Sequence, residues 1–438
     1  MGLGQTLWPN LRFVPRALPY VRMPSEGVRR EEILQTAAQL FASSGFRTSL
    51  ADIAEACGIL PGSLYHHFDS KEAIVVELIH RYHDDLDRVA KEALDTLHEP
   101  THRSIEAKIL DFGRAIAACG VEHRAALLLT LYEPPMVAGD ELAGLAQMPA
   151  SIHEAMHELL KAGRKADTIR SGIDLALLGD RLCTSMLNVG VGVSHVTPGG
   201  ERVPDLRIKI LLHGIAQRSP ADSALDRSNA LRTARRSVES WDAENDDADD
   251  RLTHLFAVAR AEFGRRGYES TTMRDIAAAS GMSTGTVYRL LGSKDQLLLD
   301  IMSSYSKKVV GAWDAVVRSD SPPLAKIDAL IWVAINVVDR FSDEVRISLA
   351  WMRQSPPSTP SSPSLGVFLP AQLRHVRALM AEGAKTREIR YEGGTADIRA
   401  RCLLEAIWGA GTPVATAGIQ GAHALARDTV LRGAAAHD

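Results

Sequence analysis

One stretch of the sequence occurs twice, and this internal repeat limits the folds open to the chain more than any other feature. Residues 31–78 and 252–301 match each other, and from Asp52 to Lys71 the two copies align without a gap at a constant offset of 223. Solenoid and propeller repeats have periods of roughly 20–50 residues, so this period is too long for them. We therefore interpret the repeat as one whole domain used twice in 438 residues.

The composition favours an all-α fold for both copies and for the segments after them. Hydrophobic residues make up 45% of the chain, charged residues 24% and aromatic residues 5%, which is ordinary for a soluble globular protein. The sequence is rich in alanine, the best helix former, and no segment alternates apolar and polar residues as a half-buried strand would. The longest uncharged stretch, residues 406–426, is broken by glycines and a proline. It predicts two small-residue helices that meet at a tight turn rather than a membrane span.

Each copy of the repeat predicts a helix-turn-helix. An amphipathic helix comes first, followed by a short helix that contains Asp-Ile-Ala. Gly58 and Gly281 then stand where the chain must turn sharply, and glycine adopts the positive φ that suits such a turn. A second short helix ends in Tyr65 or Tyr288. This spacing is typical of a unit that lays a recognition helix into the major groove of DNA.

The same residues carry a family resemblance. Gly45-Phe46, Asp52-Ile53-Ala54, Gly58, Gly62-Ser63-Leu64-Tyr65-His66-His67-Phe68 and Lys71, with their counterparts in the second copy, resemble the DNA-binding domain of TetR-family repressors. The whole chain resembles tandem actinobacterial regulators of lipid and steroid genes. The resemblance implies a sequence-specific DNA-binding regulator, a repressor, in which each DNA-binding domain is followed by helices for ligand binding and dimerisation. It implies no enzymatic activity and no cofactor.

The resemblance also implies which residues contact DNA. Leu64 and Val287 are expected in the small domain core. Phosphate contacts are expected from Thr48, Tyr65, Lys71, Thr271, Tyr288 and Lys294. Base contacts are expected from Pro61, Gly62, Ser63 and His66 in the first copy and from Thr284, Gly285, Thr286 and Arg289 in the second. Ser70 and Ser293 are expected to cap the next helix, and Ser293 with Gln296 matches a capping box.

The two copies differ in ways that bear on DNA binding. Leu60 stands where the second copy has the capping residue Ser283. Residues 28–71 carry four bases and five acids, a net charge of −1, whereas residues 251–294 carry seven bases and three acids, a net charge of +4. Because phosphate neutralisation dominates affinity for DNA, the second copy is expected to bind more tightly. The formal net charge of the chain is −4, so any positive field must be local.

The repeat divides the chain into six segments. They are a disordered arm (1–25), a first helix-turn-helix domain (26–70), a first helical regulatory domain (71–218), a charged linker (219–248), a second helix-turn-helix domain (249–293) and a second helical regulatory domain (294–438). Like-charge blocks stay solvated, so the linker is expected to be an extended tether, with a clamp on DNA phosphate as the alternative. Four widely spaced cysteines argue against disulfides and for a reducing cytoplasm.

The resemblance further implies a pseudo-dimer and an effector. The last helices of each half, near 172–217 and 395–432, are expected to pack together within one chain, so that two unlike heads read an asymmetric operator. Release by a small apolar effector (a lipid, a steroid or an acyl-CoA) is expected, and two chains could also associate. The pocket candidates are Phe112, Tyr132, Met136, Met156, Met186, Trp332, Phe341, Trp351 and Phe368.

Two other functions are open on the residues alone. A ligand-binding helical scaffold with one or both heads inactive would carry the same repeat. The segment His153-Glu154-x-x-His157 matches the zinc metallopeptidase pattern, but Leu160 and Gly163 stand where the extended pattern needs glycine and histidine. We therefore expect no metal site, and we regard these histidines as neighbours of an apolar helix stripe.

Overall fold

The computed structural model describes residues 26–45, 48–99, 103–132, 149–191, 200–243, 250–268, 270–353, 368–390 and 393–436. These residues confirm the all-α fold, because they form helices and only two isolated β-bridges, Ile169 with Ala435 and Ala216 with Ile389. The expected disordered arm, residues 1–25, lies outside them, and so do residues 244–249, which include the acidic end of the expected linker.

The first unit, residues 26–218, runs from a small head into a helical bundle. Its helices are α1 (Glu26–Ser44), α2 (Leu50–Ala56), α3 (Pro61–Leu64), α4 (Lys71–His98), α5 (Ile105–Glu122), α6 (Arg124–Tyr132), α8 (Ala150–Lys165), α9 (Leu175–Val191), η3 (Gly200–Arg202) and α10 (Val203–His213). The long α4 begins in the head, where Ser70 caps it as expected, and continues into the bundle.

The second unit, residues 250–436, repeats this order. Its helices are α13 (Asp250–Arg266), α14 (Met273–Ser280), α15 (Thr284–Leu291), α16 (Lys294–Arg318), α17 (Pro323–Arg340), α18 (Ser342–Arg353), α19 (Phe368–Lys385), α20 (Ala396–Trp408), η4 (Gly409–Gly411), α21 (Val414–Ala426) and η5 (Arg427–Leu431). The short η4 joins α20 to α21, which confirms the expected pair of small-residue helices. Among the described residues, no helix combines the length and the apolarity that a membrane span requires.

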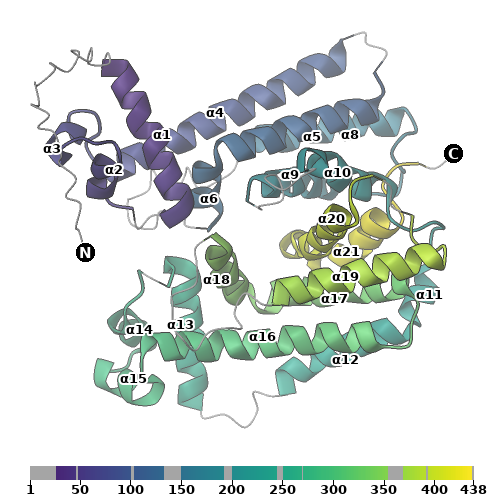
Figure 1. Cartoon of the computed structure of the whole chain (residues 1–438). Helices are drawn as coiled ribbons and strands as arrows, with labels where there is room; N and C mark the ends of the chain where they lie inside the picture. Colours follow the sequence, from purple (N-terminus) through teal and green to yellow (C-terminus); the bar gives the residue numbers. More distant parts are fainter. Residues whose placement is uncertain are drawn as a thin grey trace, which may run out of the picture.

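The two units lie one above the other, with both heads on the same side of the molecule (Figure 1). The heads, α1–α3 and α13–α15, are on the left of the view, and the C-terminal helices α20 and α21 lie next to α9 and α10 on the right. Helix α6 packs on α1, α18 packs on α13, and α6 and α18 also contact each other. Each head is therefore supported by a helix that touches the other unit.

Backbone hydrogen bonds join the two units at the end far from the heads. The amides of Ile215 and Ala216 donate to the carbonyls of Val430 and Leu431, each over 2.9 Å. The amide of Ala434 returns a bond of 3.0 Å to the carbonyl of Leu211. Because these bonds are made by the main chain, they define one register between the units. We call this region the joint.

Two glycines allow the main chains to meet so closely at the joint. Gly214 and Gly433 have φ values of +68° and +88°. A Cβ atom on Gly214 would lie 2.4 Å from the carbonyl oxygen of Leu431, and one on Gly433 would lie 2.4 Å from the carbonyl carbon of His213. Both the positive φ and the backbone contact therefore require glycine.

Two buried arginines of the first unit add side-chain contacts to the second unit. Arg181, on α9, donates to the carbonyl of Ala406 over 3.0 Å, and its burial lowers the pKa to about 10. Arg207, on α10, pairs with Glu405 and also donates to the carbonyl of Ser185 over 2.7 Å. Helix α9 thus contacts α20 through Arg181, and α10 packs on α20.

Most of the expected linker, residues 222–243, is helical rather than an extended tether, which corrects our expectation. Residues 222–243 form α11 (Asp222–Asp226) and α12 (Asn229–Ala243), and α12 packs along α16 and α17. Arg235 lies over the ring of Trp332, with 5.3 Å from its guanidinium carbon to the ring centroid, which argues against its use as a DNA clamp. The residues of α12 that are buried fall at helical spacing and outweigh the charges between them; they are Ala230, Leu231, Ala234, Val238 and Trp241.

A buried ionic cluster ties α11 to the core of the second unit. Asp328, on α17, is fully buried and accepts two hydrogen bonds of 2.9 Å from Arg427. His423 Nε2 lies 3.0 Å from the same carboxylate, and Arg427 also pairs with Asp226 of α11 over 2.9 Å. Burial acts to raise the pKa of Asp328, but the bonds from Arg427 and His423 outweigh it, and the pKa is lowered.

We expect Asp328→Asn to lower the free energy of unfolding of the second unit by about 3 kcal/mol, because it leaves the buried guanidinium of Arg427 without this carboxylate. Five of the six tryptophans follow residue 240, so tryptophan fluorescence in urea reports on this unit. The lowered pKa of Asp328 stabilises the fold above the unfolded pKa of about 4, and this contribution is lost as the pH falls below it. The difference in unfolding free energy between wild type and Asp328→Asn should therefore become smaller in acid.

Asp314→Asn is the matched control, because Asp314 pairs with an exposed Arg318 over 3.9 Å. Exposed pairs contribute about 0–1 kcal/mol. Equal effects of the two substitutions would contradict the role given to Asp328.

Candidate nucleic-acid interface

Local sequence explains how the second helix of each head begins and ends. Ser49 caps α2 and Thr272 caps α14, and each forms a capping box with the aspartate three residues later. Gly58 and Gly281 follow with φ values of +64° and +68°, as the sequence analysis expected. Both turns therefore direct the next helix across the preceding one, which is the helix-turn-helix geometry.

The two recognition helices differ in length and in capping. Helix α15 spans Thr284–Leu291, and the hydroxyl of Ser283 accepts from the amide of Thr286 over 3.2 Å. Helix α3 spans only Pro61–Leu64, and its N-cap residue Leu60 makes no side-chain cap. The shorter helix, α3, therefore lacks a cap that contributes about 1 kcal/mol to helix stability.

The predicted base-reading positions lie on the open face of each recognition helix. Leu64 and Val287 are fully buried, which confirms their expected place in the core. Tyr65 and Tyr288 are 55% and 52% exposed. The remaining positions are exposed (Pro61, Gly62, Ser63, His66, Gly285 and Arg289) or half-buried (Thr284 and Thr286). These side chains are thus available to a duplex, and their contacts with DNA stay a prediction.

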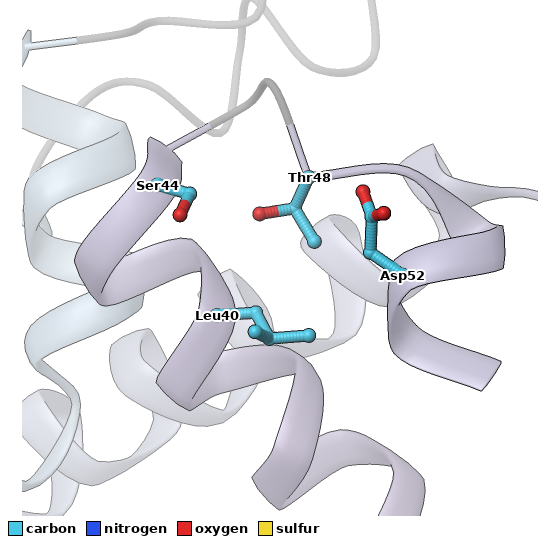
Figure 2. Close-up of a pocket in the computed structure, with 4 residues that line it drawn as sticks. All are labelled: Leu40, Ser44, Thr48 and Asp52. Atoms are coloured by element: carbon cyan, nitrogen blue, oxygen red, sulfur yellow. The ribbon is translucent and has the colours of Figure 1, made fainter. Parts of the chain in front are cut away.

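The two threonines expected to contact phosphate are buried, which corrects our choice of residues. Thr48 lies between α1 and α2, where it lines a cavity of about 400 Å³ with Leu40, Ser44 and Asp52 (Figure 2). Thr271 is fully buried, and its hydroxyl donates to the carbonyls of Glu262 and Gly267 over 3.2 and 2.9 Å.

The exposed hydroxyls at these helix starts belong to the next residues, Ser49 and Thr272. Serine or threonine three residues before aspartate is a capping signature that the sequence already contains. Sequence reasoning could have found these two residues from that signature. The phosphate-contact hypothesis therefore moves to Ser49 and Thr272.

The second predicted phosphate lysine has a structural role as well. The ammonium of Lys294 donates to the carbonyls of Tyr268 and Thr271, both over 3.0 Å, and lies 4.2 Å from the centroid of the Tyr268 ring. Ser293 caps α16 as expected, but the Gln296 side chain binds Asp300 over 2.8 Å instead of completing a capping box. Lys294 thus joins the start of α16 to the loop before α14.

Ion pairs reduce the free positive charge of both heads. Arg29 and Arg30 of the first head pair with Glu32 and Glu77, and Arg30 also lies over the Phe68 ring. In the second head, Arg265 and Arg266 both pair with Glu262, at 2.6 and 3.4 Å. Arg289 is exposed on the recognition helix. The second recognition helix therefore carries an exposed cation, whereas α3 carries no basic residue.

The capping boxes also hold an acid in its charged form at each head. Hydrogen bonds from Thr272, together with the ion pair to Arg266 at 3.0 Å, lower the pKa of Asp275 to about 2. Hydrogen bonds from Ser49 lower the pKa of Asp52 in the first head. Each acid therefore fixes the start of the second helix of its head.

Comparison with known proteins agrees with this geometry. The family model of bacterial regulatory proteins of the tetR family matches residues 33–78 and 255–301, one match for each head. The chain is 35% identical over 193 residues to the HTH-type transcriptional repressor KstR2 of Rhodococcus jostii, covering 43% of this chain and 91% of that protein. The chain belongs to the TetR family. Two family matches in one chain make it a tandem member.

Two further relatives of this TetR-family chain are also KstR2 proteins. KstR2 of Mycolicibacterium smegmatis is 30% identical over 203 residues, covering 43% of this chain and 91% of that protein. The structure of the ketosteroid transcriptional regulator KstR2 of Mycobacterium tuberculosis is 26% identical, covers 40% of this chain and 89% of that chain, and has a TM-score of 0.35.

The candidate pocket residues of the helical domains are part of the packed core where they are described. Phe112, Met156 and Met186 are buried in the first unit, and Trp332 and Phe341 in the second. Met136 and the side chains of Tyr132, Trp351 and Phe368 lie outside the described residues. In the first unit these side chains come from α5, α8 and α9, whereas in the second Trp332 lies on α17 and Phe341 directly follows it.

The histidines of the metallopeptidase pattern lie on α8. His153 and His157 are half-buried, and His153 Nδ1 lies 3.4 Å from Asp180 on α9. Within the described ranges, no three histidine, cysteine or acidic side chains are grouped so that they could hold a metal ion. Ile152, Met156, Leu159 and Leu160 of the same helix are fully buried, as expected of an amphipathic helix.

We expect Ser283→Ala to destabilise the second head by about 1 kcal/mol, because it removes the N-cap of α15. Hydrogen exchange of the amides at the start of α15 measures this directly, and Thr286 should lose the most protection. Ser280→Ala is the control, since that hydroxyl bonds the carbonyl of Ala277 over 3.1 Å inside α14. Unchanged exchange at Thr286 would contradict the cap.

Proposed function

We propose that this TetR-family chain is a repressor that reads an asymmetric operator with two unlike heads held in one polypeptide. The observation that carries the proposal is that both recognition helices lie on the same side of one molecule. The two units that carry them are joined by main-chain hydrogen bonds. The chain is similar to named transcriptional repressors, which supports repression rather than activation.

The joint supports an intramolecular pseudo-dimer. Gly214 and Gly433 allow the backbones to meet, and Arg181 and Arg207 are buried where α9 and α10 reach α20. Fusion in one chain makes this association intramolecular, at an effective concentration on the order of mM. One chain then presents both heads without a second copy.

An effector would act by changing how α6 and α18 pack against the heads. Helices α6 and α18 each pack on the first helix of a head and contact each other. Glu344 of α18 is buried and pairs with Arg260 of α13 over 3.3 Å. A small apolar effector in a helical domain would need to favour the arrangement that does not fit DNA. A coupling of about 1–3 kcal/mol would lower operator occupancy several-fold to about a hundredfold.

A mobility-shift assay on the DNA upstream of the gene for this protein, followed by footprinting, tests the function. Binding of one fragment at low nanomolar to micromolar protein, weakened by salt, is the expected result. Failure to bind any fragment of that region in dilute buffer would favour a helical scaffold with inactive heads. The short, uncapped α3 and the net charge of −1 make the first head the weaker binder.

Arg289→Ala should weaken one half-site and leave the other unchanged. Arg289 suits a bidentate contact with guanine, worth about 1–3 kcal/mol, and the matching residue of the first head is His66. Titration of operators mutated in each half-site measures the effect, and His66→Ala serves as the counterpart for the other half-site. Equal loss at both half-sites would reject the asymmetric operator.

We expect one chain to occupy one minimal operator, because the joint supplies the second head. Sedimentation of the complex with a labelled operator gives the stoichiometry. Gly433→Val should place a side chain against the backbone of His213 and lower affinity for the full operator while both heads stay folded by circular dichroism. Two chains on each minimal operator would contradict the intramolecular pseudo-dimer.

A further inference from the structure

Leu60 is the most exposed large hydrophobic residue among those that the structure describes. It is 77% exposed at the N-cap position of α3, with φ −70° and ψ 143°. At the same position of the second head, Ser283 caps the helix. Leucine at an N-cap costs about 1 kcal/mol relative to serine, and an exposed leucine recovers little by burial. The stability of the head therefore does not explain this residue.

The side chains around Leu60 offer few polar groups to a base edge. Pro61, Gly62 and Ser63 follow it and are all exposed. None of these four residues carries a guanidinium, an amide or a carboxylate, so they cannot make the bidentate hydrogen bonds that distinguish guanine, adenine or cytosine. The Ser63 hydroxyl can make a single hydrogen bond to either kind of base edge, so it discriminates little. Apolar contact is then the specific chemistry that these residues offer in the major groove, and its target is the 5-methyl group of thymine.

We propose that Leu60 is a specificity-determining residue of the first head and that its side chain packs on a thymine methyl in the first half-site. Pro61 extends the same apolar edge at the first turn of α3. This inference rests on the proposed DNA binding and adds the chemistry of one half-site. The second head then reads guanine through Arg289, and the first reads thymine through a branched apolar side chain.

The test replaces each thymine of the footprinted operator, one at a time, by deoxyuridine, which removes only the 5-methyl group. The half-site that is insensitive to Arg289→Ala is the first. For the wild-type chain, one substitution in that half-site should lower affinity about fourfold, the effect of losing one buried methyl group. Leu60→Ser, which restores the cap found in the second head, should bind the thymine and deoxyuridine operators equally.

Leu290→Ser is the matched control, because Leu290 is also an exposed leucine, 38% exposed at the far end of α15. It should keep the fourfold discrimination. Circular dichroism checks that Leu60→Ser stays folded, which its added cap favours.

The outcomes separate the two proposals. If the wild-type chain binds no upstream fragment, the proposed function fails, and this inference fails with it. If the chain binds but no deoxyuridine in the first half-site weakens it, or Leu60→Ser keeps the discrimination, then only the role of Leu60 is overturned.

Discussion

The main-chain hydrogen bonds between residues 211–216 and 430–435 are the interaction on which the rest of the structure depends. They fix one unit against the other in a single register, because a slip by one residue would leave buried amides and carbonyls unpaired. The heads lie at the opposite side of both bundles (Figure 1). Their separation is therefore set by this contact and by the meeting of α6 with α18. A repressor of this design needs that separation to match the spacing of two half-sites.

Once one chain carries both heads, the heads no longer need to be alike. A symmetric dimer presents two copies of one recognition helix and reads a palindrome. Here the second head has a capped α15 with an exposed Arg289, whereas the first has a short α3 that begins at an exposed Leu60. The two surfaces suit different chemistry, polar reading in one case and apolar contact in the other. Because both heads belong to one chain, every molecule presents both of these surfaces together.

Local features of the heads could be predicted from the sequence, and features that depend on packing could not. The turns at Gly58 and Gly281 and the cap at Ser70 follow from residue type and spacing. The choice of Thr272 over Thr271 could also be predicted, from the capping signature that ends at Asp275. The bonds that the buried Thr271 donates to the carbonyls of Glu262 and Gly267 depend instead on the packing of α13. The linker prediction was wrong for another reason. Its arginines suggested a solvated chain, although the apolar residues at helical spacing between them already indicated α12.

The sequence by itself determined that two helix-turn-helix heads exist, that each is followed by helices, and that the heads differ in charge. These conclusions rest on interactions within a few residues, where propensity and capping dominate. The tertiary structure alone decided that residues 214 and 433 lie backbone against backbone, that Asp328 is buried between Arg427 and His423, and that both heads lie on one side. Such contacts join residues up to about 220 positions apart. Their geometry follows from the packing of whole helices, which no local pattern specifies.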